Sequence, residues 1–121
     1  METSILAKLI LVHNPGCSKS RAALAILNEK GLQPEIIDYI DSPPSPGDIA
    51  HWLDLLGMQA RDLMRQDESE YRELGLDDST LDNDQLIDAM CRHPRLIQRP
   101  IVISADRALI ARPPERVLDM L

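Results

Sequence analysis

Residues 9–27 read LILVHNPGCSKSRAALAIL, and three patterns follow one another along this segment. The run 9–12 is short and wholly apolar, as in a buried strand, and Pro15 and Gly16 then mark a tight turn. From Arg21 onward, small and apolar residues recur with the spacing of a helix face. The segment therefore predicts a strand, a turn and a helix, with Cys17 in the first turn of that helix.

The position of Cys17 favours a reactive thiol. A helix N-terminus carries unpaired N–H groups and a partial positive charge, which stabilise a thiolate or a bound oxyanion. Lys19 and Arg21 add formal positive charge, and the small side chains of Ser18 and Ser20 leave room for a ligand. These features predict a thiol pKa below the usual ~8.5. The alternative is a small buried residue at a helix start, which would more often have apolar neighbours.

Composition limits the classes of function. The 121 residues suffice for one domain, 1–121, with a single core. There is no Phe, and Tyr39, Trp52 and Tyr71 are the only aromatic residues, so the core is expected to be aliphatic. Scarce aromatics and a formal net charge of −7 argue against binding to nucleic acid or to an anionic membrane. Ten arginines against three lysines favour a local site for an oxyanion, because the guanidinium group binds such anions bidentately.

The cysteine and histidine content predicts neither a disulfide framework nor a metal centre. Cys17 and Cys91 are too few for a disulfide scaffold, and the three histidines are scattered along the chain. The N-terminus lacks the basic and then apolar pattern of a signal peptide, and no apolar run approaches the ~20 residues of a membrane span. We therefore expect a cytoplasmic monomer with no bound cofactor.

The rest of the chain continues the α/β pattern. The first strand is expected at 8–12, and the first helix at 18–30 ends at Gly31, a favourable residue for a left-handed C-terminal position. A second strand at 33–39 would then lie parallel to the first. After a proline-rich linker at 41–47, capping signals and amphipathic spacing predict a helical insertion at about 46–96. Its helices are expected near 46–57, 60–65, 69–74 and 82–93.

The last part of the chain predicts a β-hairpin and a final helix. Strands are expected at 101–104 and 108–111, joined by a turn at 105–107. A helix then starts at Pro113 and Pro114, with Val117, Leu118 and Leu121 as its apolar residues. The order βαβ, helical insertion, ββα, with a cysteine after the first strand, resembles the thioredoxin fold.

Three segments resemble the ArsC-type arsenate reductases, the class coupled to glutathione and glutaredoxin. They are residues 13–21 around Cys17, the central residues 84–88, 93–94 and 98–102, and the C-terminal residues 112–118. The similarity runs in register along nearly the whole chain, including the linker at 41–44. The chain stops at Leu121 without the tail of longer relatives, so it is most similar to a short branch of that family.

The resemblance implies thiol-dependent reduction of arsenate to arsenite. Cys17 would be the nucleophile, glutathione the thiol co-substrate, and glutaredoxin the partner that resolves the mixed disulfide. His13 would act near the cysteine, and three arginines would bind the oxyanion: Arg65, Arg99 and Arg112. The loop residues expected to contact the substrate are Ser18, Lys19, Ser20 and Arg21.

The thioredoxin-like fold also implies a specific geometry at Arg99. In such folds a cis-proline before the third strand faces the cysteine loop, and cis bonds are nearly confined to X–Pro. We therefore expect Pro100 to be cis and Arg99 to point at Cys17. The pair Ser18-Lys19 replaces a Gly-Thr pair of well-known relatives and adds a charge beside the nucleophile, so another oxyanion remains open as the substrate.

Several of these residues also have simpler interpretations. Arg65 could pair with a neighbouring carboxylate at 62, 67 or 68, and Arg112 could be a surface residue before two prolines. His13 could be a half-buried histidine at a strand end. Cys91 matches no role in the family and is expected to be a packing or surface residue.

Three other classes of protein are alternatives to an arsenate reductase. Regulators of the Spx type share this fold and bind a protein partner, but their usual C-x-x-C switch is missing because residue 20 is serine. A monothiol oxidoreductase acting on another substrate remains open. A phosphatase-like reductase is excluded, because its C-x5-R motif would need arginine where Ala23 stands.

Overall fold

The computed structural model describes residues 9–104 and 106–120, and the chain divides into two compact units. We call the first the sheet unit; it comprises the residues up to Ser42 and those from Arg99 onward. The second, the helical unit, is Pro43–Gln98. It covers the predicted insertion and extends it by a few residues at each side; that the two units form one domain stays a prediction.

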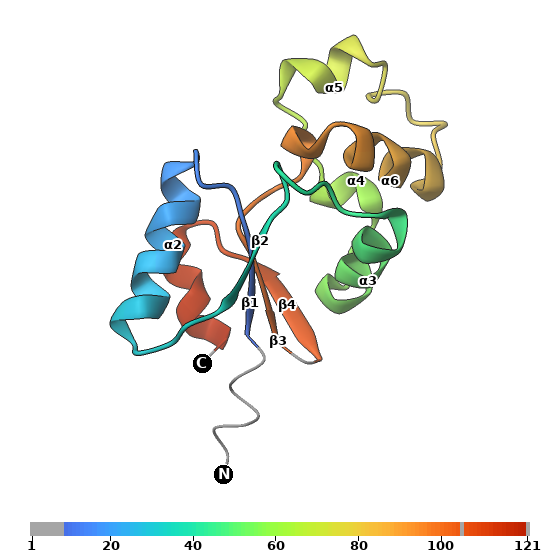
Figure 1. Cartoon of the computed structure of the whole chain (residues 1–121). Helices are drawn as coiled ribbons and strands as arrows, with labels where there is room; N and C mark the ends of the chain where they lie inside the picture. The colour runs from blue at the N-terminus through green and yellow to red at the C-terminus, as the bar shows by residue number, and fades with distance from the viewer. Residues whose placement is uncertain (1–8, 105, 121) are drawn as a thin grey trace. The chain divides into compact units, whose positions relative to one another are not determined.

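The sheet unit contains a mixed four-stranded sheet in the order β2-β1-β3-β4 (Figure 1). The strands are β1 (Ile10–His13), β2 (Glu35–Asp38), β3 (Ile101–Ser104) and β4 (Arg107–Ile110). β1 and β2 are parallel, whereas β3 is antiparallel to both β1 and β4. This topology confirms the predicted thioredoxin-like α/β fold.

The crossover between β1 and β2 is helix α2 (Ser18–Glu29). Gly31 follows its C-cap with φ of 79°, a left-handed conformation that glycine adopts without a steric penalty. The helix thus ends at the glycine that the sequence predicted, and the chain turns back to enter β2 beside β1.

Helix α2 and the C-terminal 3-10 helix η2 (Pro114–Met120) lie together on one side of the sheet (Figure 1). Aliphatic side chains from both helices and from the strands form the core between them. Removal of this apolar surface from water is the main stabilising contribution, at about 25 cal/mol per Å². The core residues are Leu9, Leu11, Ala23, Leu27, Val102, Ala111, Val117 and Met120.

The C-terminal element differs from the sequence prediction. It is a 3-10 helix, in which three residues complete a turn, so Val117 and Met120 fall on the same side and are buried. Leu118, predicted to share the apolar face, is 41% exposed. Leu121, also assigned to that face, lies outside the described residues.

Strand bounds also moved by a few residues. β1 extends to His13, one residue beyond the predicted end, and Lys8 lies outside the described residues. β2 is shorter than the predicted 33–39, and β4 begins one residue earlier than expected. The hairpin turn includes residue 105, which is also outside the described residues.

The helical unit consists of short helices with clear capping signals. Helix α3 (Pro46–Leu56) starts with a capping box: the Asp48 N–H donates to Ser45 Oγ at 3.1 Å, and the Ser45 N–H donates to Asp48 Oδ2 at 3.0 Å. Gly57 ends it with φ of 68°. The other elements are α4 (Ala60–Leu63), α5 (Ser69–Glu73), α6 (Asn83–Arg92) and η1 (Pro94–Leu96).

One part of the predicted insertion is not helical. The sequence predicted a helix at 60–65, but α4 ends at Leu63 and Met64 forms an antiparallel bridge with Ile97. The Arg65 N–H donates to Leu96 O at 2.6 Å. Pairing between segments distant in sequence therefore overrides local helix propensity at this point.

Within residues 9–104 and 106–120, no helix combines the length and the apolar character that a membrane span requires.

Candidate active site

Cys17 occupies the N-cap of α2, between the turn that follows β1 and the first helical residue. Its φ and ψ are −102° and 125°, the extended conformation typical of a helix cap. The Cys17 N–H donates to Asn14 O at 2.9 Å, and the Cys17 carbonyl accepts from the Arg21 N–H at 3.0 Å. This backbone arrangement places the side chain beside the unpaired N–H groups of the first turn.

The pKa of Cys17 is lowered from its ordinary value. Partial burial raises the pKa. Hydrogen bonds from the backbone N–H groups of Ser20 and Lys19 lower it, and these bonds and Arg99 together outweigh the effect of burial. The Arg99 guanidinium contributes both its charge and a hydrogen bond to the sulfur. The thiolate, which is the nucleophilic form, is therefore stabilised at this position.

Arg99 lies two residues before the start of β3, and its peptide bond to Pro100 is cis, as predicted. The bond between Arg112 and Pro113 is also cis. Arg99 Nε and Nη1 are buried, and no hydrogen-bond partner for them is present among the described residues. A buried donor without a partner costs about 1–3 kcal/mol, and more when the group is charged. A bound anion beside Cys17 would supply the missing acceptors.

His13 ends β1 and is buried, with Nδ1 2.8 Å from Ser20 Oγ. Ser20 is fully buried, and its Oγ also accepts from the Asn14 N–H at 3.1 Å. Burial lowers the pKa of His13, the nearby Asp38 raises it and Arg21 lowers it, for a net decrease. A neutral histidine thus joins the strand end to the loop and to the first turn of α2.

Two further contacts hold the turn. Asn14 Oδ1 accepts from the Gly16 N–H at 2.9 Å, and Arg21 Nη1 donates to Pro15 O at 2.8 Å. The sequence reasoning did not single out Asn14, although an asparagine two residues before a turn glycine is typical of an Asx-turn.

The predicted loop residues therefore differ in whether their side chains are accessible to a ligand. Ser18, Lys19 and Arg21 are exposed, whereas the Ser20 hydroxyl is engaged inside the protein. Asp38, which acts on the pKa of His13, comes from β2 and carried no signal in the sequence. It lies opposite His13 because the two strands pair in register.

Arg112 and Arg65 have different surroundings from those of Arg99. Arg112 is exposed between β4 and η2, and it is not among the groups that shift the pKa of Cys17. Arg65 belongs to the helical unit, where its Nη1 lies 3.0 Å from Glu68 Oε2. This is one of the carboxylate pairings that the sequence left open. Arg65 Nε is nevertheless buried, with no partner in the part of the chain that the structure describes.

Cys91 has the opposite electrostatic environment to Cys17. Burial raises the pKa of Cys91, and the carboxylates of Asp88 and Asp48 raise it further. It therefore favours the thiol form. Among residues 9–104 and 106–120, no cluster of His, Cys, Asp and Glu could hold a metal ion.

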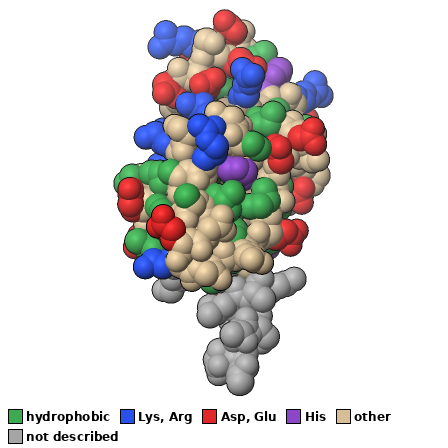
Figure 2. Space-filling model, turned by 60° about the vertical axis from the view of Figure 1, so that its left-hand side comes forward, with side chains coloured by type: hydrophobic (Ala, Val, Ile, Leu, Met, Phe, Trp, Pro, Cys, Tyr) green, Lys and Arg blue, Asp and Glu red, His purple; other side chains and the backbone are tan. Residues whose placement is uncertain are grey.

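The face in Figure 2 shows basic and acidic side chains interspersed, with hydrophobic side chains between them. What distinguishes Cys17 is the set of donors directed at its sulfur.

Comparison with known proteins identifies a family of similar sequences and structures. A model described as the ArsC family matches residues 12–120. The protein YfgD of Escherichia coli K12 is 46% identical over 112 residues, which cover 92% of this chain and 94% of YfgD. An arsenate reductase of Neisseria meningitidis serogroup B is 42% identical, covering 93% of this chain and 97% of its own. The structure of an arsenate reductase from Vibrio cholerae superposes with a TM-score of 0.91 at 43% identity, covering 94% of this chain and 98% of that one.

Proposed function

Because the chain belongs to the ArsC family, we propose that it is an arsenate reductase that uses Cys17 as nucleophile and glutathione as thiol co-substrate. The observation that carries this proposal is the geometry at Arg99. The guanidinium stabilises the Cys17 thiolate, and two of its buried N–H groups have no acceptor among the residues that the structure describes. An oxyanion in attack range of the sulfur would satisfy those donors.

In the first step the Cys17 thiolate attacks the arsenic atom. A sulfur–arsenic bond forms, one arsenate oxygen leaves as water after protonation, and arsenic remains pentavalent. Thiolate and arsenate repel each other, because both are negatively charged. Preorganised donors offset this repulsion, and each is typically worth roughly 3–4 kcal/mol in the transition state.

In the second step the Cys17 and glutathione sulfurs together supply the two electrons that reduce arsenic. Its thiol attacks the adduct, arsenic takes up two electrons and leaves as arsenite, and the two sulfurs form a mixed disulfide. Arsenate and two thiols thus give arsenite, one disulfide and one water. Glutaredoxin then resolves the mixed disulfide with a further glutathione thiol and returns Cys17 to the reduced state.

Three arginines share the binding of the oxyanion in this proposal. Arg99 holds it beside the sulfur during attack, while Arg112 and Arg65 bind the arsenical intermediates and the product. These roles are supported by the exposure of Arg112 and by Arg65 Nε, which has no hydrogen-bond partner within 9–104 and 106–120. His13, neutral and joined to Ser20, keeps the cysteine loop in place.

The loop around Cys17 completes the site. The Ser20 and Lys19 N–H groups stabilise the thiolate, and the exposed Ser18, Lys19 and Arg21 side chains contact the incoming anion. Lys19 adds a positive charge on the approach to the sulfur, which favours anionic substrates in general.

The test is a coupled assay with arsenate, glutathione, glutaredoxin, glutathione reductase and NADPH. Arsenate-dependent NADPH oxidation is expected for the wild-type protein and for Cys91→Ser, and it should be absent in Cys17→Ser. Equal loss in both cysteine variants would contradict the assignment of Cys17.

Two other outcomes would replace the proposal. Reduction of glutathione mixed disulfides without any dependence on arsenate would favour a monothiol oxidoreductase. A stable complex with a protein partner, formed without thiol-dependent turnover, would favour a regulator.

A further inference from the structure

A groove opens on the helical unit between α3, α4 and α6, and no residue assigned to the active site lines it. Its volume is about 530 Å³, within the range of sites that hold small ligands or short peptide segments. Its apolar side chains are those of Ala50, Leu53, Met58 and Ile87, and its acidic residues are Asp54, Asp62 and Asp84.

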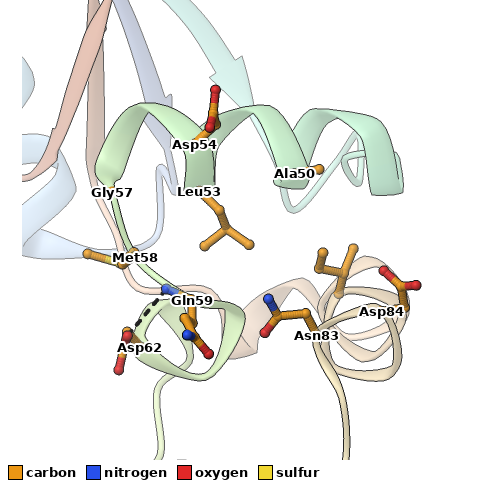
Figure 3. Close-up of a pocket in the computed structure, with 10 residues that line it drawn as sticks. Ala50, Leu53, Asp54, Gly57, Met58, Gln59, Asp62, Asn83 and Asp84 are labelled. Carbon is orange, nitrogen blue, oxygen red and sulfur yellow. Dashed lines mark hydrogen bonds between the residues drawn. The ribbon is translucent and has the colours of Figure 1, made fainter.

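The base of the groove is apolar. Leu53 and Ile87 are 7% and 8% exposed, so each still presents a small surface to the groove. Figure 3 shows Leu53 pointing from α3 into the space opposite Asn83 and Gln59. Such a surface accepts an aliphatic side chain that would otherwise stay in water.

The rim is negatively charged. Three aspartates line it, and none of the ten lining residues is Lys, Arg or His. The N-terminus of α6 contributes a partial positive charge of at most about half a unit, which does not offset the carboxylates of Asp62 and Asp84. The groove therefore disfavours anions and favours cationic groups.

The charge of the whole chain is concentrated on this unit. Residues 43–98 contain twelve Asp and Glu against five Arg, a formal charge of −7 that equals the charge of the entire protein. The rest of the chain carries eight residues of each sign. A cationic partner would thus be attracted to the helical unit rather than to the protein in general.

The arginines of the helical unit do not neutralise the groove, because several are engaged elsewhere. Arg61 donates to Leu76 O at 2.7 Å and to Asp78 O at 2.8 Å. Arg65 pairs with Glu68 and Arg92 with Asp88, each at 3.0 Å. None of these three arginines lines the groove.

The carboxylates are spread around the rim rather than converging. In Figure 3, Asp54 points away from Leu53 on the far side of α3, while Asp62 and Asp84 lie at opposite ends. A metal ion would need ligands within about 2–3 Å of one point. A segment that carries several separated positive charges fits this arrangement instead.

We propose that this groove binds a basic, partly apolar segment of a protein partner. One aliphatic side chain of the segment packs between Leu53 and Ile87, and flanking Lys or Arg side chains reach Asp62 and Asp84 at the two ends of the groove. Apolar anchoring with charges at the edge is the usual arrangement of peptide-binding grooves. Long-range attraction by the helical unit would speed association at low ionic strength.

The first experiment is an NMR titration of the ¹⁵N-labelled full chain with the probe peptide acetyl-Lys-Leu-Lys-Arg-Leu-Lys-amide. Amide shifts are expected at residues 50–59 and 83–88, and binding should weaken as NaCl rises from about 0.05 M to 0.3 M. The matched peptide with Glu in place of each basic residue should cause no shifts. Binding of both peptides alike, or shifts confined to other residues, would overturn the proposal.

Paired variants distinguish binding in the groove from attraction by the net charge of the protein. The double change Asp62→Asn with Asp84→Asn should weaken peptide binding about fivefold, as expected for two surface charge pairs. The control Asp77→Asn with Asp106→Asn removes two exposed charges outside the groove and should change binding by less than about twofold. Equal weakening in both doubles would show that only net charge matters and would refute the site.

A steric test uses exposed alanines. Ala50 lines the groove, so Ala50→Arg places a long cation in it and should abolish peptide binding. Ala25, exposed on α2, provides the control Ala25→Arg with the same change of size and charge. Both variants should retain arsenate turnover with glutathione. Unchanged binding by Ala50→Arg would also refute the site.

Discussion

The Arg99 guanidinium lowers the pKa of the Cys17 thiol, although the two residues come from opposite ends of the chain. The start of β3 pairs with the end of β1, so Arg99, two residues before β3, lies beside the loop that follows β1. The guanidinium and the backbone N–H groups of Ser20 and Lys19 then act on the same atom. This relationship links the fold to the reactivity of the thiol.

Arg99→Gln is expected to move the alkylation of Cys17 to higher pH. The charge and the hydrogen bond of Arg99 both stabilise the thiolate, so their removal raises the pKa of the thiol. The measurement is the iodoacetamide rate as a function of pH in a Cys91→Ser background. Arg107→Gln removes an exposed arginine from β4 and should leave the profile in place. An unshifted profile for Arg99→Gln would contradict the contact.

Arsenate should stabilise the protein against heat through Arg99. A ligand that binds only the folded state at a hundred times its Kd adds about 2.7 kcal/mol to the free energy of unfolding. We expect Tm to rise with arsenate but not with chloride at equal ionic strength, because arsenate supplies acceptors for the buried Nε and Nη1. Arg99→Gln should lose most of this gain and Arg107→Gln should keep it. A rise of equal size in both variants would argue for nonspecific ion effects.

Ser20→Ala should destabilise the fold by about 1–3 kcal/mol. The substitution removes the Oγ that contacts His13 Nδ1 and accepts from the Asn14 N–H, and it leaves both groups without that partner. Urea unfolding measures the change in the free energy of unfolding. Ser18→Ala, an exposed position in the same helix, should stay within about 0.5 kcal/mol of wild type. Equal stability of the two variants would show that the buried hydroxyl contributes little.

Arg61→Lys should destabilise the helical unit by about 2 kcal/mol. The Arg61 guanidinium donates to Tyr71 Oη, Leu76 O and Asp78 O, and lysine cannot reproduce that planar set of donors. Amide hydrogen exchange should show faster exchange within 60–80, whereas the sheet unit keeps its protection. The exposed Arg72 of α5 offers the control Arg72→Lys, for which exchange should not change.

Local signals predicted most helix ends correctly. Gly31 and Gly57 stop α2 and α3 in left-handed conformations, and the capping box of Asp82 and Gln85 starts α6. Each of these signals acts through residues within one turn, so the chain adopts them without help from distant parts. Prediction failed where distant segments compete, as at Met64, which pairs with Ile97 instead of continuing α4.

In the cysteine loop, too, local features were predictable from the sequence and contacts in the interior were not. Its proline, glycine, cysteine and basic residues predicted a helix N-terminus that stabilises a thiolate, and the pKa of Cys17 is indeed lowered. The sequence could not show that the Ser20 hydroxyl faces His13 in the interior. Residues two or three positions apart at a helix start can face either solvent or core, and only packing decides between them.

The sequence by itself determined the strand–turn–helix around Cys17, the helix caps and, by resemblance, the family. These depend on local backbone preferences and on residue identities in fixed order. Only the tertiary structure decided that Arg99 acts on the sulfur, that two of its buried N–H groups find no acceptor in the described part of the chain, and that Leu53 and Ile87 line one groove. Each of these depends on elements far apart in the chain, whose distances are set by strand pairing and core packing.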